Sequence, residues 1–434
     1  MLVPVLIDQT FIALLPMVNT IIVSRLGQSS MSGVSIIDQV NQLISFVMMA
    51  IGFGGSVMVA QYTGRGDREG VERTVKQTCS ISLIGAVIAT GFVLMSGDWI
   101  VATALKAAEP DMIAIARVYL NITCLSYFFL GFYSNAAQLL RGIGRPRMAM
   151  IITIAVQLST MVLSYVFIYG LRLGINGAAY ANLLGRAIGY VLSSILIKRA
   201  GLVKRVLDMY TLKLHLPTQK LLIRFGLPVG IQNFFFVGAR LVMNRFILLF
   251  GTDHISANVV FTQILDMQCA GSTLVSQMAP AIMGMAKGRE NQDEIKSTFK
   301  ILCYFAFVFG VIYAVIPALF AGQFPKIYNL SETAAPIATN MIRANVLYIV
   351  PLVWFAQAAP ASFRGIGDTL VPPMITAGSL WVARVGTIAF LSIFFDIGAY
   401  ASFFAVMNDY ILRNILYFWR YRSGAWLRAQ KGVD

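Results

Sequence analysis

Charged residues are scarce in this sequence. Asp, Glu, Lys and Arg make up 12% of the 434 residues, about half the share found in an average soluble domain. Hydrophobic residues make up 58%, and the mean hydropathy is +0.73. The polar residues are too few to cover the surface of a water-soluble protein of this length. The composition therefore excludes a soluble globular protein and indicates a membrane protein.

Cysteine and histidine are scarce as well. All four cysteines lie inside apolar runs, and they are Cys79, Cys124, Cys269 and Cys303. Thiols in such runs are more often buried side chains than disulfides. The two histidines, His215 and His254, are too few and too far apart in the sequence for a metal site. We therefore expect no disulfide, no bound metal and no cofactor.

Motifs of soluble enzymes are absent. The segment Gly64-Arg-Gly66-Asp67 is too short for a phosphate-binding loop, lacks the terminal Lys-Ser/Thr and follows a predicted helix instead of a strand. A turn at a helix end accounts for this segment. We therefore do not expect an enzyme.

Long apolar runs are abundant, and a helix crosses a bilayer in about 20 apolar residues. The first half predicts spans at 2–24, 33–62, 77–97, 113–139, 148–170 and 177–197. The second half predicts spans at 225–249, 256–284, 301–322, 337–360, 372–395 and 399–419. The first residues enter a span directly, so we expect no cleavable signal peptide. A first membrane helix is usually preceded by basic cytoplasmic residues, and here none precede it. We therefore expect the true start codon to lie further upstream.

The net charge of +15 comes from Lys and Arg in the short loops between spans. With both termini in the cytoplasm, the inside loops hold 23 of the 34 Lys and Arg residues and the outside loops hold four. Such a bias sets membrane topology and accounts for the charge without nucleic acid. We expect a monomer in the inner (plasma) membrane, surrounded by lipid, with both termini cytoplasmic.

The chain repeats itself once at half-length. Arg-Gly-Ile-Gly occurs at 141–144 and again at 364–367, and Ile152-Thr153 recurs as Ile375-Thr376 at the same offset. Gly27 and Pro4 recur close to this offset as Gly251 and Pro228. Duplicated bundles of membrane helices are mostly transporters.

The repeat and the spans together predict the fold. We expect an all-α polytopic membrane protein whose twelve helices form two six-helix lobes. Because each copy holds an even number of spans, both copies point the same way, and a pseudo-two-fold axis along the membrane normal relates them. The N-terminal lobe is expected at 1–200, a cytoplasmic linker at 201–222, and the C-terminal lobe with its basic tail at 223–434.

Segments in both halves share their order and spacing with one transporter family. In the first half they are Gly55–Glu69, Arg141–Arg147, Tyr165–Gly170, and Gly177-Ala-Ala with Arg186. In the second half they are Arg364-Gly-Ile-Gly-Asp-Thr, Trp381-Val-Ala-Arg384-Val, Asp409-Tyr410 with Arg413, and Arg422–Trp426. Together they resemble the multidrug and toxic compound extrusion (MATE) transporters. The resemblance implies two six-helix lobes around a V-shaped cavity and export of drug-like organic cations in exchange for Na⁺ or H⁺.

The chain departs from this family where the resemblance places coupling residues. Asn19 stands at the family's acidic position in the first helix, and Thr160 and Ser164 stand at its Asn/Asp positions in the fifth. Phe236 stands at an acidic position of the seventh helix, and the predicted span 337–360 contains no carboxylate. Neither of the two sets of residues by which this family couples transport to a cation is complete in this sequence.

Carboxylates inside spans are costly and mark candidate functional sites. Asp38 and Asn41 share a face of the second predicted span at i, i+3, where they could hold Na⁺ or carry a proton. The alternative is a structural Asp38 hydrogen-bonded within its lobe. Asp8 and Asn19 lie three turns apart on one face of the first span. Asp8 could join the ion path or remain a solvated charge at the helix end.

The second half offers a further acid and a set of ion pairs. Asp266, with Gln263 on its face, is the coupling candidate of that lobe. Asp409 and Arg413 are one turn apart, and Arg384 lies on the preceding span, so an internal ion-pair cluster is expected. The candidates for lining a substrate cavity are Phe234, Phe235, Phe236, Met243 and Gln263.

Two other functions remain open. A lipid-linked oligosaccharide flippase of the same superfamily would use cavity arginines to hold pyrophosphate, and the candidates are Arg117, Arg240, Arg245 and Arg343. A channel or a substrate-sensing protein would need a ring of subunits or a filter sequence, and the sequence gives no sign of either. Secondary active efflux of amphipathic or cationic small molecules is the interpretation that the sequence favours.

Overall fold

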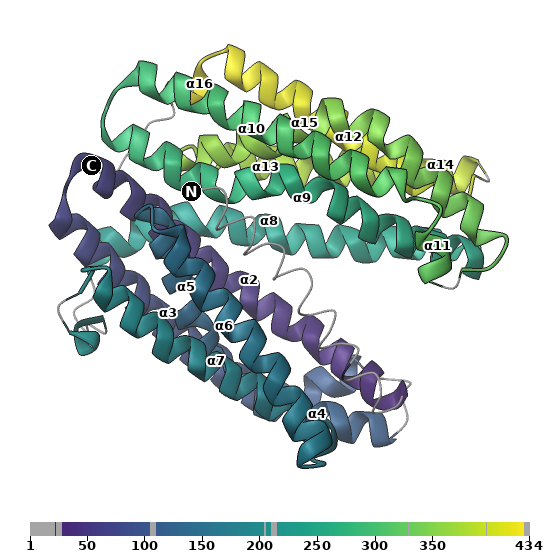
Figure 1. Ribbon diagram of the computed structural model, residues 1–434, viewed down its shortest axis with the longest axis horizontal. Helices are drawn as coiled ribbons and strands as arrows, with labels where there is room; N and C mark the ends of the chain where they lie inside the picture. Colours follow the sequence, from purple (N-terminus) through teal and green to yellow (C-terminus); the bar gives the residue numbers. More distant parts are fainter. Residues whose placement is uncertain are drawn as a thin grey trace. The chain divides into compact units, whose positions relative to one another are not determined.

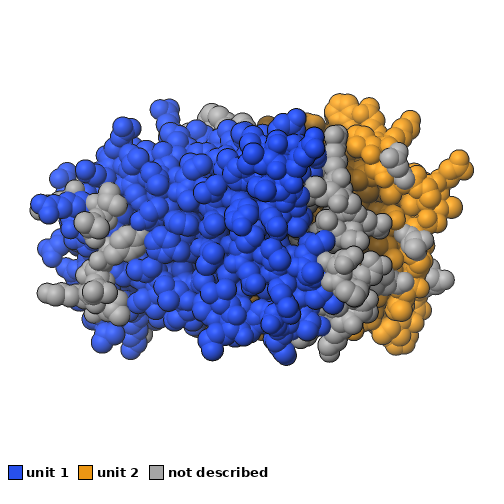
Figure 2. Space-filling model, turned by 90° about the horizontal axis from the view of Figure 1, so that it is seen from below, with its two compact units in different colours: residues 1–230 blue, residues 231–434 orange. Residues whose placement is uncertain are grey.

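The computed structural model describes residues 22, 28–104, 110–203, 205–209, 215–328, 330–395 and 397–428. Within these ranges the chain forms helices and turns and contains no strand. It divides into two compact units, residues 1–230 and 231–434 (Figure 2). The division falls inside helix α8 (Leu216–Leu248), which begins within the segment predicted as a linker.

Unit 1 is a bundle of long helices joined by short turns (Figure 1). The helices are α2 (Gln28–Arg65), α3 (Arg68–Ala104), α4 (Pro110–Cys124), α5 (Tyr127–Gly142), α6 (Pro146–Tyr165) and α7 (Gly174–Arg199). Helix α2 packs against α3, α4 and α5, and α6 packs against α7. A short helical turn, η2 (Val206–Met209), follows α7 and packs against α3.

Unit 2 repeats this order. Its helices are α9 (Thr252–Gly288), α10 (Gln292–Leu319), α11 (Phe324–Ile327), α12 (Ala334–Gly365), α13 (Val371–Ser379), α14 (Gly386–Phe394), α15 (Tyr400–Arg422) and α16 (Ala425–Arg428). Helix α9 packs against α10 and α12, and α12 packs against α15. Helix α9 therefore takes the place that α2 has in unit 1.

The helices are long and apolar enough to cross a membrane. Eight qualify among the described residues, or nine if a bent pair counts as one span. Large apolar side chains remain exposed on both units, such as Met95 at 91% and Val382 at 72%, as expected of surfaces that face lipid. Every predicted span within the described residues coincides with a helix or a series of helical segments. The first predicted span lies outside the described residues, apart from Ile22.

Three spans are interrupted where an uninterrupted helix was predicted. The fourth span bends by 53° between Ile113–Cys124 and Tyr127–Gly142, and the Ser126 hydroxyl at the break donates to the Thr123 carbonyl at 2.5 Å. The fifth span ends in a π-helix, η1 (Val166–Gly170), and the eleventh contains another, η3 (Leu380–Val385). Such local π segments often occur at functional sites.

The repeated Arg-Gly-Ile-Gly has the same structural role in both units. Gly144 and Gly367 have φ of +78° and +105° and end their helices in the left-handed region that glycine tolerates. Gly142 and Gly365 allow a close helix contact. A Cβ at Gly142 would lie 2.6 Å from the Ser56 carbonyl oxygen, and one at Gly365 would lie 2.7 Å from that of Pro280.

Candidate functional site

Asp38 lies on α2 within a network of side chains from α4 and α5. Its Oδ1 accepts hydrogen bonds from Asn41 Nδ2 at 3.3 Å and from the Tyr119 hydroxyl at 3.2 Å. Asn41 extends the network, because its Oδ1 accepts from the Tyr127 hydroxyl at 2.7 Å and its Nδ2 donates to Thr123 Oγ1 at 3.4 Å. The predicted Asp38–Asn41 pair is therefore in contact and joined to residues far away in sequence.

Burial differs sharply within this network. Asn41, Tyr119 and Tyr127 are buried, whereas Asp38 is exposed. The carboxylate thus lies at the open side of a buried set of hydrogen-bond donors. Among the described residues, its Oδ2 has no hydrogen-bond partner. Both hydrogen bonds that the carboxylate accepts from Asn41 and Tyr119 therefore go to its Oδ1.

A positive charge acts on this network from α7. Arg186 Nη1 donates to Ser126 Oγ at 2.7 Å, at the break between α4 and α5. Arg186 also interacts electrostatically with Asp38. Its charge favours the ionised carboxylate and opposes binding of a further cation. The arrangement therefore places one exposed carboxylate near a positive charge and two neutral donors, all of which favour its ionised form.

Two further ion-path candidates of the first half lie outside the described residues. Asp8 and Asn19 belong to the residues that the structure leaves undescribed. Thr160 packs against Gly185 of α7. Ser164 is buried, and no partner for its hydroxyl occurs in the described part of the chain.

Unit 2 contains a cavity of about 150 Å³ formed by α8, α9, η3 and α15. Four residues predicted for the substrate cavity or for coupling line it, and these are Phe236, Met243, Gln263 and Asp266. Phe234 and Phe235 do not line it. Phe235 instead packs edge-on against Trp381, with ring centroids 6.3 Å apart. The Gln263 side chain accepts a hydrogen bond from the Tyr328 hydroxyl at 2.6 Å.

Asp409 is fully buried between two arginines beside this cavity. Its Oδ2 lies 2.8 Å from an Nη2 atom of Arg384 and 2.8 Å from one of Arg413. Its Oδ1 accepts from Arg413 Nε and from the Ser379 hydroxyl, each at 2.8 Å. Both guanidinium groups lie within 6 Å of the Tyr410 ring centroid, where the ring's π-electrons attract them. The predicted contacts among Arg384, Asp409 and Arg413 therefore occur, and both oxygens of Asp409 are engaged within the cluster.

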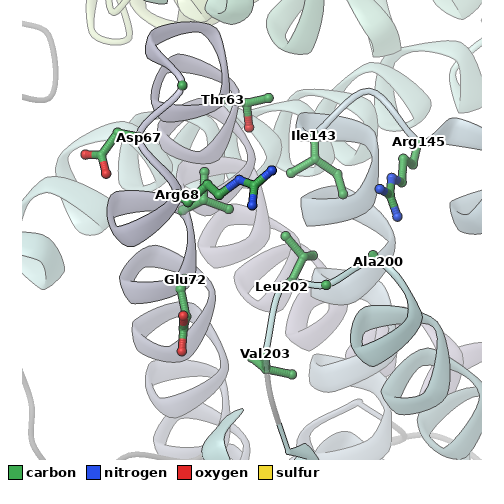
Figure 3. A pocket seen from close by; sticks show the side chains of 12 residues that line it. Thr63, Asp67, Arg68, Glu72, Ile143, Arg145, Ala200, Leu202 and Val203 are labelled. Atoms are coloured by element: carbon green, nitrogen blue, oxygen red, sulfur yellow. The ribbon is translucent and has the colours of Figure 1, made fainter.

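A second cavity, of about 690 Å³, lies at the ends of α2, α5 and α7 in unit 1. Arg68 reaches into it from the start of α3, and Asp67 points away from it (Figure 3). Asp67 caps α3 by accepting from the Gly70 amide at 2.9 Å, and Glu72 pairs with Lys76 at 2.8 Å. This cavity lies at loops that the positive-inside pattern places in the cytoplasm.

The sequence did not single out the residues that surround Asp38. Tyr119, Thr123 and Tyr127 recur at i, i+4 and i+8, which places them on one face of the predicted fourth span. That stripe of hydroxyl groups was a detectable signal. Its partner could not be read from the sequence, because Tyr119 and Asp38 are 81 residues apart.

Known proteins are similar to the whole chain. A family model described as MatE matches residues 4–166 and 228–389, one segment in each half. A probable multidrug resistance protein NorM of Thermotoga maritima is 24% identical over 425 residues, which cover 94% of this chain and 88% of that protein. An uncharacterized transporter YisQ of Bacillus subtilis is 23% identical, covering 99% and 94% of the two proteins.

Solved structures show the same fold. The outward-facing conformation of a multidrug resistance MATE family transporter has a TM-score of 0.90 at 22% identity, covering 98% of this chain and 95% of that chain. A MOP superfamily transporter from Pyrococcus furiosus has a TM-score of 0.89 at the same identity and coverage. Its binding pocket is described as having reverse polarity.

Proposed function

Because the chain belongs to the MatE family, we propose that it is a secondary active transporter that exports amphipathic or cationic small molecules in exchange for Na⁺ or H⁺. Family membership confirms the resemblance to MATE transporters, and the fold is that of a multi-pass, all-helical protein with two six-helix lobes. Relatives named as probable multidrug resistance proteins support drug-like substrates. Alternating access is the corresponding mechanism, in a transporter rather than an enzyme.

The proposal that Asp38 binds the coupling ion rests on the hydrogen-bond network around this residue. An antiporter needs a group that binds the ion in one state and releases it in another. Asp38 combines an exposed carboxylate with buried donors, and its Oδ2 is open to an ion. The acid of unit 2 that is most strongly bound, Asp409, is held by two arginines and is a poorer candidate.

The atoms around Asp38 favour H⁺ over Na⁺ as the coupling ion. Hard cations require several oxygen ligands. The groups that contact Asp38 are donors, namely Asn41 Nδ2 and the Tyr119 hydroxyl, and the Asn41 oxygen already accepts from Tyr127. A proton needs only one free carboxylate oxygen, which Asp38 Oδ2 provides.

Everted membrane vesicles test this proposal. Extrusion of a cationic dye is measured with a pH gradient alone and with a sodium gradient alone. The wild type should extrude dye under the pH gradient, and Asp38→Asn should lower the rate at least tenfold by removing the proton site. Asp98→Asn is the matched control, since Asp98 is an exposed acid of the same unit, and it should retain the wild-type rate. Unchanged ion dependence in Asp38→Asn would exclude Asp38 as the coupling group.

No observation favours the flippase. Arg117, one of the arginines considered for pyrophosphate, pairs with Asp98 at 2.8 Å and belongs to unit 1. Arg240, Arg245 and Arg343 belong to unit 2, and of these only Arg240 lines the cavity near Asp266.

A further inference from the structure

The cavity of unit 2 contains two opposite charges that do not pair with each other. Arg240 of α8 and Asp266 of α9 both line it, and they are close enough to interact electrostatically. Within the described residues, neither side chain has a hydrogen-bond or ion-pair partner. The third charged residue of the lining, Arg384, is already held by Asp409. As far as the described residues show, one cation and one anion without hydrogen-bond or ion-pair partners therefore line the same small space.

Two buried polar atoms of the lining also lack partners. Asn258 is 6% exposed and Ser402 is 0% exposed. Asn258 Oδ1 and Ser402 Oγ both remain without a hydrogen bond in the described structure. Leaving a buried polar atom without a hydrogen bond is unfavourable, so such atoms mark a place where a ligand or water can complete the set. Both atoms belong to residues that line the cavity.

The polar and apolar groups follow the two helices in an ordered way. Asn258, Thr262 and Asp266 stand at i, i+4 and i+8 on α9, so they lie on one face and span about 12 Å. On α8, Phe236, Arg240 and Met243 stand at i, i+4 and i+7. The cavity, called the slot below, is therefore lined by mainly polar residues of α9 and by two apolar residues and one arginine of α8.

We propose that this slot binds the head group of a zwitterionic amphipathic molecule. A ligand ammonium group pairs with Asp266, a ligand carboxylate pairs with Arg240, and the apolar remainder contacts Phe236 and Met243. A cation alone would leave Arg240 unpaired, and an anion alone would leave Asp266 unpaired. The cavity of about 150 Å³ is smaller than a drug-sized pocket of roughly 300–1,000 Å³, so it receives a head group only.

The inference rests on the proposed function, for which it names a substrate class. Three probes with one indole ring test it: tryptophan carries both charges, tryptamine lacks the carboxylate and indole-3-propionate lacks the amine. Binding of each probe to the purified full-length chain in detergent is measured by competition with radiolabelled tryptophan. The wild type should prefer tryptophan to either single-charge probe by about tenfold, the factor that about 1.4 kcal/mol supplies.

Variants assign each charge to its partner. Arg240→Met should remove the preference over tryptamine and keep the preference over indole-3-propionate. Asp266→Asn should do the reverse. The matched controls are Arg245→Met, an exposed arginine of the same helix, and Asp253→Asn, an acid at the start of α9 outside the cavity. Both controls should bind as the wild type does.

Three results would overturn the inference. Equal binding of tryptophan and tryptamine by the wild type would exclude recognition of the carboxylate. Unchanged preferences in both cavity variants would place the site elsewhere, and a change only in variants with a lowered unfolding temperature would indicate a structural effect. Arg240→Lys separates carboxylate recognition from a structural effect. It retains the positive charge, so it should keep part of the preference for tryptophan over tryptamine.

Binding in detergent needs no ion gradient, so the two proposals can fail separately. Dye extrusion by a protein that shows no tryptophan preference would count against the slot and leave the exporter standing. Tryptophan binding that follows the predicted pattern, without extrusion under either gradient, would count against the exporter.

Discussion

The two units have the same helix contacts but different polar interiors. In both, the glycine of the repeated motif lets two helix backbones approach, at Gly142 against Ser56 and at Gly365 against Pro280. The residue after each motif differs. Arg145 is exposed in unit 1, whereas Asp368 is buried in unit 2 and pairs with Arg420 at 2.6 Å.

The acids inside the predicted spans 33–62 and 399–419 differ in the same way. Asp38 of unit 1 receives two neutral donors and stays exposed, while Asp409 of unit 2 is buried between Arg384 and Arg413. The comparison teaches that the duplicated scaffold is constrained by backbone contacts, which tolerate few side chains. The polar groups around this scaffold differ, so Asp38 of unit 1 is exposed whereas Asp409 of unit 2 is held by two arginines.

The largest expected effect comes from the locked acid. Asp409→Asn leaves two buried arginines without their counter-charge, and such a loss costs about 3–5 kcal/mol. Thermal unfolding in detergent should show a large fall in the midpoint. Asp38→Asn is the matched change in unit 1 and should cost less than about 1 kcal/mol, because its partners are neutral donors. Equal stability of the two variants would contradict the division between a structural and a coupling acid.

The next test concerns the contact that the units share. Gly142→Ala and Gly365→Ala each force a methyl group against a carbonyl oxygen, and overpacking of this kind costs about 1–3 kcal/mol. Both variants should lower the unfolding midpoint by similar amounts. Gly91→Ala and Gly378→Ala are the controls, since a Cβ there meets nothing within 4 Å, and they should be neutral or stabilising. A strong effect at only one of the two motif glycines would break the structural equivalence of the units.

The smallest effect is expected at the solvent end of unit 2, where Asp253 precedes the predicted span 256–284. Hydrogen bonds from the Thr333 and Ser331 hydroxyls, at 2.6 and 2.7 Å, lower the pKa of Asp253. A lowered folded-state pKa contributes stability above the unfolded pKa of about 3.9, and the contribution disappears as pH falls through the folded pKa. Thr333→Val should therefore lower the unfolding midpoint slightly at pH 6, and the difference from the wild type should shrink toward pH 3.

Thr339→Val is the control for this measurement, because the Thr339 hydroxyl donates only to the Ala335 carbonyl. Its effect should not vary with pH. A Thr333→Val effect that is equally independent of pH would show that the hydroxyl does not act through Asp253.

Short-range patterns in the sequence predicted contacts within one helix well. The Asp38–Asn41 and Asp409–Arg413 pairs follow from spacings of three and four residues, and both contacts occur. The bend at Ser126 and the π-helix that carries Arg384 were missed, because a single hydroxyl or one extra residue in a turn leaves the apolar pattern unchanged. Arg384 was expected beside Asp409 from the preceding span, and this contact also occurs. Tyr119 and Tyr127 were not predicted as partners of Asp38 and Asn41, because sequence spacing says little about which helices meet.

The sequence by itself determined the membrane class, the predicted spans, the duplication and the positions of the motif glycines. These follow from apolar run length and backbone geometry, which are local properties. Only the tertiary structure decided that Tyr119 contacts Asp38, that Tyr127 contacts Asn41, and that Asn258 and Ser402 line one cavity with Asp266. Helices distant in sequence meet along faces that packing selects, and the chemistry of each site depends on which polar groups that packing brings within a few ångströms.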